Sequence, residues 1–125
     1  MRPIEFRIYC EQNMEMLKVD YLHFDDKGEL WSATSVDDVV PYLENQKDWH
    51  LMQYTGLKDK NGSKIFEGDI GWDEHNECWG VVVFDEGKFL YEWENISEDL
   101  WEVKGDIEIR GNSHDNPELI GGEAE

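Results

Sequence analysis

The sequence is poor in basic residues, and this shortage narrows the classes of protein that it can encode. Only 11 of the 125 residues are Lys or Arg, against 30 Asp or Glu, so the formal net charge is −19. Binding to nucleic acid depends on cationic side chains that displace counterions from phosphates. An anionic membrane repels so negative a surface in the same way. We therefore expect no direct contact with nucleic acid or with a membrane.

Cysteine and long apolar runs are also scarce. The two cysteines, Cys10 and Cys78, lie far apart and form no C-x-x-C pair. The start of the sequence has no secretory leader, so we expect free thiols and a cytoplasmic location. No apolar run approaches the roughly 20 residues that a membrane-spanning helix needs.

Common catalytic motifs are absent as well. The sequence has no Walker loop, no glycine-rich dinucleotide motif and no G-x-S-x-G elbow. "DEHNEC", residues 73–78, does combine carboxylate, imidazole and thiol groups, which are metal-ligand types. On a strand only Asp73, His75 and Glu77 would share a face. The alternative is a polar turn between two strands, and we expect no enzyme activity, no metal and no cofactor.

Aromatic residues are abundant, at 13% of the chain, and they favour β-strands. Near the start, Ile4, Phe6 and Ile8 alternate with other residues in the period of two that is typical of a strand. A turn and a second extended run follow, which predicts a β-hairpin that ends at a turn containing Gly28. Short strands between turns spaced 8–12 residues apart continue along the chain and predict a small β-barrel or sandwich.

Residues 31–50 fit this strand pattern least well. Ser35 and Asp38 resemble a helix capping box, and Pro41 would break a helix that began there. The segment predicts either a short helix ending near Val40 or an irregular excursion.

The densest pattern is "LMQYTGLKDKNGSKIFEGDI", residues 51–70. Asn61 and Gly62 form the strongest short signal for a hairpin turn. Gly68 and Asp69 predict a second tight turn, because glycine accepts a positive φ and aspartate hydrogen-bonds the turn backbone. We interpret these four residues as structural turn formers.

This block resembles the signature of the YopX family, small proteins encoded by bacteriophages and prophages. Three other segments resemble the family too: "IEFRIYCEQNMEM", "GVVVFDEGKF" and "GNSHDNPELI". The resemblance implies a phage or prophage origin, a bacterial cytoplasmic setting and a mainly β fold with little helix. It also implies an SH3-like β-barrel with an added N-terminal β-hairpin. It supplies no activity, catalytic residue or cofactor.

On this basis we expect one YopX-like domain over residues 1–120. It would comprise a hairpin element at about 1–30, a variable segment at 31–50 and a barrel core at about 51–120. The last residues, 121–125, are rich in glycine and glutamate and should be disordered.

The later part of the chain has more large aromatic rings than a small barrel readily buries. We therefore predict an aromatic interaction surface for a protein partner or a second copy of the chain, made up of Trp72, Trp79, Tyr91, Trp93 and Trp101. Residues 67–125 carry eighteen acidic and only three basic residues. This half would assist the aromatic surface; alternatively, it mimics nucleic acid and inhibits a basic host protein. A metal-dependent enzyme at residues 73–78 is the third hypothesis.

Overall fold

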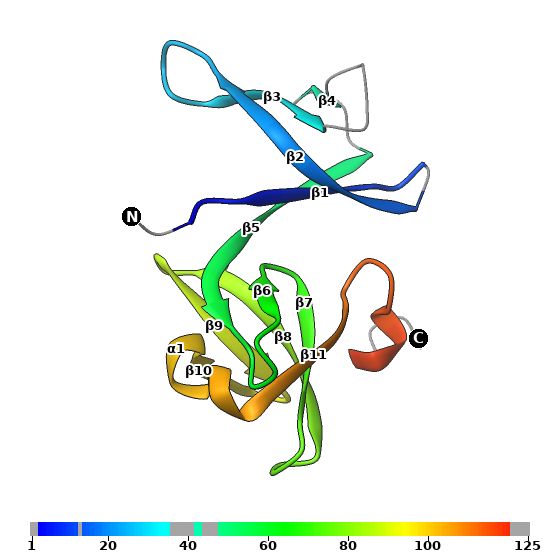
Figure 1. The fold of residues 1–125 in the computed structure, drawn as a ribbon, viewed down its shortest axis with the longest axis vertical. Helices are drawn as coiled ribbons and strands as arrows, with labels where there is room; N and C mark the ends of the chain where they lie inside the picture. The colour runs from blue at the N-terminus through cyan, green and yellow to red at the C-terminus, as the bar shows by residue number, and fades with distance from the viewer. Residues whose placement is uncertain (1–2, 13, 36–41, 44–47, 121–125) are drawn as a thin grey trace. The chain divides into compact units, whose positions relative to one another are not determined.

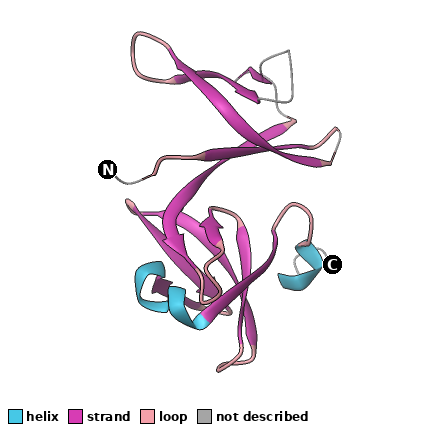
Figure 2. Cartoon of the chain, viewed as in Figure 1, coloured by secondary structure: helices cyan, strands magenta, loops and turns pink. Residues whose placement is uncertain are grey.

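The computed structural model describes residues 3–12, 14–35, 42–43 and 48–120, and most of these lie in antiparallel β-strands (Figures 1 and 2). The predicted mainly β class with little helix is confirmed. The chain divides into two compact units, an N-terminal unit of Ile4–Gln53 and a C-terminal unit that begins at Tyr54. Strand β5, Trp49–Lys58, continues from one unit into the other.

The N-terminal unit is built around strand β1. Its strands belong to a six-stranded sheet with the order β4-β3-β2-β1-β5-β6. The strands are β1 (Phe6–Cys10), β2 (Glu15–Phe24), β3 (Leu30–Ser35), β4 (Tyr42–Leu43) and the first half of β5. The antiparallel pairing of β1 with β2 confirms the predicted hairpin. Gly28 has a φ of +83° in the turn between β2 and β3, as its position in the sequence predicted.

Ser35, which the sequence offered as the cap of a short helix, belongs to a strand. Ser35 is the last residue of β3 and is buried, and β3 pairs with β2 along most of its length. Ser32 and Ala33 are buried beside it. "WSATS" offers no alternation of large apolar residues, so its strand character comes from pairing with β2 rather than from its own sequence. Residues 36–41 lie outside the described residues, as does the predicted disordered tail at 121–125.

The C-terminal unit holds a five-stranded antiparallel sheet with the order β10-β9-β8-β7-β11. Its elements are β6 (Lys64–Phe66), β7 (Asp69–Asp73), β8 (Cys78–Asp85), β9 (Lys88–Trp93), β10 (Ile96–Asp99), α1 (Leu100–Val103), η1 (Lys104–Asp106), β11 (Ile107–Asn112) and η2 (Pro117–Ile120). Among the described residues, neither sheet closes into a barrel. None of the helices in the described part of the chain is long and apolar enough to cross a membrane.

Helix α1 is a single turn that directly follows β10. The Asp99 side chain accepts a hydrogen bond from the backbone N–H of Trp101 and so caps the helix. Leu100, the first helical residue, is fully buried. The cap and this buried anchor explain why Trp101 to Val103 form a helical turn before the chain resumes as a strand at Ile107.

The hydrophobic core of the C-terminal unit takes residues from strands and helix alike. Ile65 of β6 joins the five-stranded sheet and α1 in this core, which draws together residues 42 positions apart in the chain. The cluster consists of Ile65, Val82, Tyr91, Leu100 and Ile107.

Tyr91 packs over a pair of glycines in the middle of the sheet. Gly71 of β7 and Gly80 of β8 are direct cross-strand partners. A Cβ atom on Gly80 would lie 2.6 Å from Cε2 of Tyr91, and one on Gly71 would lie 3.1 Å from Cε1. The Tyr91 hydroxyl donates a hydrogen bond of 2.9 Å to the Gly71 carbonyl. The two glycines therefore provide the space that the ring fills.

Asp59 organises the turn between β5 and β6. Its Oδ1 accepts hydrogen bonds from the backbone N–H groups of Asn61 and Ser63, each at 2.9 Å. Its Oδ2 accepts a third, at 2.8 Å, from Ile109 of β11. Gly62 completes this turn with a φ of +83°. One buried carboxylate thus shapes the loop and ties it to a strand 50 residues later.

Gly68 and Asp69 form the next turn. Gly68 has a φ of +88°, and its N–H donates to the Val82 carbonyl at 2.8 Å. The Asp69 carboxylate accepts a 2.7 Å hydrogen bond from the backbone of Phe66. This turn is therefore held by its own side chain and by strand β8.

Candidate interaction site

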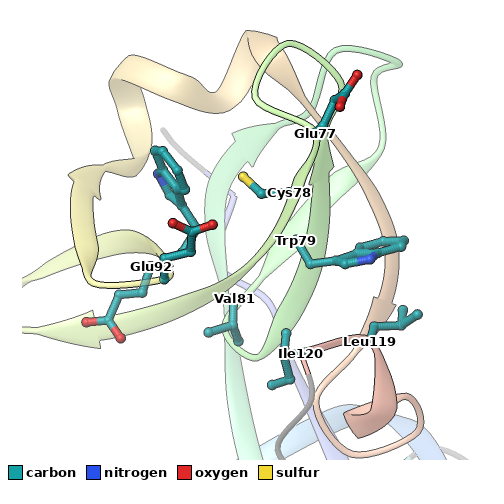
Figure 3. A pocket seen from close by; sticks show the side chains of 9 residues that line it. Glu77, Cys78, Trp79, Val81, Glu92, Leu119 and Ile120 are labelled. Atoms are coloured by element: carbon teal, nitrogen blue, oxygen red, sulfur yellow. The ribbon is translucent and has the colours of Figure 1, made fainter.

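An open groove of about 550 Å³ lies in the C-terminal unit (Figure 3). Its walls combine tryptophan, aliphatic and acidic side chains from β8, the end of β9 and helix η2. The lining residues are Glu77, Cys78, Trp79, Val81, Glu92, Trp93, Glu94, Leu119 and Ile120.

The groove forms where β8 and β9 cease to pair. Their register runs from Asp85 opposite Lys88 to Val81 opposite Glu92. Before Val81, β8 pairs with β7 alone, as Cys78 lies opposite Asp73. After Trp93, the chain turns back as β10. The groove-lining residues of β8 and β9 lie around this end of their pairing.

Hydrogen bonds within the β9–β10 hairpin fix two of the lining side chains. The indole Nε1 of Trp93 donates a 2.6 Å hydrogen bond to Oε2 of Glu98. The carboxylate of Glu92 accepts a hydrogen bond of 3.2 Å from the Ser97 hydroxyl. Trp93 also packs against the core, so its ring is held in place before any partner arrives.

Trp79 belongs to a second aromatic arrangement on the sheet. It is the cross-strand partner of Trp72, and the two ring centroids lie 4.8 Å apart. The guanidinium of Arg110 lies 5.6 Å from the Trp72 ring and 5.9 Å from the Trp79 ring. The guanidinium also donates to Glu108 at 2.9 Å. Trp79 thus contacts a cation on the sheet and also lines the groove.

The five aromatic residues predicted as one surface do not all lie together. Trp79 and Trp93 line the groove, and Trp72 stacks beside Trp79. Trp101 is 64% exposed in α1 and is not among the residues that line the groove. Tyr91 is only 1% exposed, so its assignment to a surface is corrected: it fills the space above Gly71 and Gly80 in the core.

Two of the groove's glutamates occupy turn positions with left-handed backbone. Glu77 has a φ of +52° and Glu94 a φ of +53°. Glycine or asparagine is the usual choice at such positions, because a Cβ makes this conformation costly. Their turns hold the two carboxylates at the groove without support from a regular strand.

Cys78 is a thiol of low reactivity in this setting. It is buried and free of any disulfide, as is Cys10. Burial raises the pKa of the Cys78 thiol, and the carboxylates of Asp73, Glu94 and Glu98 raise it further. A thiol that stays protonated at neutral pH is a poor nucleophile.

The segment from 73 to 78 is a hairpin turn rather than an extended strand. Only Asp73 and Cys78 belong to strands, and the four residues between them form the turn. Asp73 accepts hydrogen bonds from the backbone of His75 and from the backbone and side chain of Asn76. Across the described ranges, no group of three or more His, Cys, Asp or Glu residues is placed to hold a metal ion. The polar-turn interpretation is therefore the one that the geometry supports.

The sequence did not predict two sets of apolar residues, one that lines the groove and one that is exposed in the N-terminal unit. Leu119 and Ile120 reach the groove from η2, and the sequence gave no sign that this short helix packs beside β8. In the N-terminal unit, Tyr21, Phe24 and Trp31 are exposed on β2 and β3.

The chain is thus an acidic, mainly β protein with an aromatic groove at a strand junction. It belongs to the YopX protein family, whose sequence model matches residues 5–121, and the resemblance seen in the sequence is confirmed. The crystal structure of protein EF1440 from Enterococcus faecalis is similar, with a TM-score of 0.71 and 26% identity. The match covers 96% of this chain and 99% of that one. No curated protein matches the chain.

Proposed function

We propose that the protein is a non-catalytic interaction module that binds a protein partner through the groove between β8 and β9. The observation that carries this proposal is the presence of two tryptophans, Trp79 and Trp93, beside three glutamates around one opening. Tryptophan is enriched at the energetic centres of protein interfaces because it buries much apolar area at little entropic cost. The fixed Trp93 ring supports binding without rearrangement.

The absence of catalysis in this proposal rests on how the candidate groups are engaged. Both carboxylate oxygens of Asp73 accept hydrogen bonds from the turn that follows it. Cys78 has a raised pKa and lies in acidic surroundings, which is the opposite of what activates a thiol.

The proposal includes the setting and the finer fold that membership of the family suggests. We place the protein in the cytoplasm of a bacterium, encoded by a phage or prophage. The C-terminal unit would be an SH3-like barrel. Ile65 of β6 shares one core with the five-stranded sheet, as expected when a small barrel wraps around a single interior.

A second candidate function is favoured by the charge of the later residues. The eighteen acidic residues after Phe66 would imitate the phosphates of nucleic acid and occupy a basic host protein. The two candidates differ in their dependence on salt, because diffuse charge attraction is screened at high ionic strength whereas aromatic docking persists.

The test is affinity capture from nuclease-treated lysate of the bacterial host, with elution along a salt gradient. The variants are Trp79→Ala in the groove and Trp101→Ala as the matched control, since Trp101 is exposed outside it. We expect a partner that survives high salt, binds the control and is lost with Trp79→Ala. Thermal unfolding of both variants checks that each is folded.

Other outcomes separate the alternatives. Basic proteins released at moderate salt, from both variants equally, would support mimicry and contradict the groove. Recovery of the immobilised chain alone would contradict both candidates, since each requires a partner from the host.

A further inference from the structure

The charge of the groove is one-sided. Of the nine described residues that line it, three are glutamates and none is Lys or Arg. Glu98 adds a fourth carboxylate beside Trp93, where it accepts the indole hydrogen bond. Carboxylates at the mouth of an apolar groove favour a cationic occupant, because the charge is attracted while its aliphatic part is removed from water.

Tryptophan rings in this protein already accept cations. The Arg110 guanidinium lies 5.6 Å and 5.9 Å from the centroids of Trp72 and Trp79. The ammonium of Lys104 lies 4.6 Å from the Trp101 centroid. These distances are within the range of about 6 Å over which a ring attracts a cation. Trp79, one of the groove's walls, thus already lies close to one guanidinium, that of Arg110.

We propose that the groove binds an arginine side chain from a basic segment of the partner protein. This rests on the proposed function and names the chemistry of the partner. The guanidinium would lie beside the Trp93 ring and face the carboxylates of Glu77 and Glu94. Its aliphatic stem would pack on Val81, beside Leu119 and Ile120 of η2 (Figure 3).

Arginine fits these walls better than lysine does. A guanidinium is planar, stacks on aromatic rings and loses less hydration than an ammonium when it leaves water. It also presents several donors, so that it can meet carboxylates from two different turns at once. Glu77 precedes β8 and Glu94 follows β9, so the two acids approach the groove from different turns.

The test uses a short fluorescein-labelled peptide in which arginine alternates with serine, and measures binding by fluorescence anisotropy near physiological ionic strength. A peptide with citrulline in place of arginine keeps the shape and removes the charge, and a lysine peptide keeps the charge alone. The protein variants are the double variant Glu77→Gln/Glu94→Gln and the single variant Glu86→Gln. Glu86 is the matched control because its φ is also +52° but it lies in the β8–β9 turn, away from the groove-lining residues.

We expect the double variant to weaken binding of the arginine peptide about tenfold, which corresponds to about 1.4 kcal/mol. Glu86→Gln should change it less than about twofold, because exposed charges far from the site are screened. The citrulline peptide should bind at least about tenfold more weakly and the lysine peptide several-fold more weakly.

Equal effects of Glu86→Gln and of the groove variants, or equal binding of the arginine and citrulline peptides, would overturn the proposal. The captured partner then separates this failure from failure of the proposed function. A partner that depends on Trp79 but is not displaced by the arginine peptide refutes the arginine site and leaves the interaction module standing. If no captured partner depends on Trp79, both the arginine site and the interaction module are refuted.

Discussion

Replacing Gly80 with alanine should destabilise the C-terminal unit, because the ring of Tyr91 occupies the space beside its Cα. The added Cβ would lie 2.6 Å from Cε2 and 2.8 Å from the hydroxyl oxygen of Tyr91. Ordinary van der Waals contacts of this kind are 3.4–4 Å. The ring has little room to retreat, since it is buried in the core and its hydroxyl is bound to the Gly71 carbonyl.

The size of the effect follows from the cost of overpacking a core. Such substitutions lower the free energy of unfolding by about 1–3 kcal/mol, and the rigid surroundings of Tyr91 place Gly80→Ala near the upper end. An unfolding entropy of about 2.1 cal/mol/K per residue gives about 260 cal/mol/K for this chain. Each kcal/mol then lowers the Tm by about 4 °C, so we expect a fall of about 8–12 °C.

Thermal and urea unfolding, followed by tryptophan fluorescence and circular dichroism, would measure this change. Gly105→Ala is the matched control, because a Cβ there meets nothing within 4 Å and Gly105 has no left-handed φ. Its effect should stay within about 0.5 kcal/mol. Combining Gly80→Ala with Tyr91→Leu should cost less than the sum of the two single changes, because the leucine frees the space. If Gly80→Ala unfolds like Gly105→Ala, Tyr91 does not pack over the glycine pair and the reasoning is refuted.

Three further predictions concern the turns and the buried tyrosine. Asp59→Ala should lower the free energy of unfolding by about 2–4 kcal/mol, because three backbone N–H groups lose the carboxylate that accepts their hydrogen bonds. Hydrogen exchange at the Ile109 amide should also accelerate in this variant. An unchanged exchange rate would contradict the hydrogen bond from β11 to Asp59. Glu86→Asn should raise the free energy of unfolding, measured with urea, by about 1 kcal/mol. Glu86 and Gly87 both have positive φ in a two-residue hairpin turn, and the asparagine-glycine pair suits such a turn best. A loss of stability would contradict that turn geometry. Burial raises the pKa of Tyr91 above its ordinary value of 10.0, so folding favours the neutral hydroxyl. The resulting contribution of Tyr91 to the free energy of unfolding is complete below pH 10, and it is lost as the pH rises toward the pKa of the folded state. Tyr91→Phe should therefore flatten the alkaline decline in stability, and an identical decline in both proteins would show that Tyr91 does not cause it.

The sequence predicted best the elements whose structure is decided locally. Period-two alternation located β1, and the glycines at 28 and 62 marked turns in which they take positive φ. Local chemistry settles these features, because few residue types accept a left-handed backbone and alternation alone assigns the faces of a strand.

The sequence did not predict the features that are decided by contacts between distant parts of the chain. β3 contains small and polar residues that become a strand only because β2 pairs with them. Tyr91 resembled the other aromatic residues in the sequence, and only the space left by Gly80 of β8 and Gly71 of β7 makes it a core residue. The groove depends on where the β8–β9 register ends and on the approach of η2, and neither has a local signature.

The link from Asp59 to Ile109 has a consequence for the order in which the chain folds during its synthesis. The β5–β6 turn looks self-contained, yet one of the three backbone groups that its aspartate binds belongs to β11, which leaves the ribosome about 50 residues later. Until then, the carboxylate can satisfy only its own loop, and Ile65 lacks the core partner Ile107. The stretch that most clearly identifies the family is therefore among the last to become rigid, and nascent chains that stop short of β11 would expose its apolar side to other proteins in the cell.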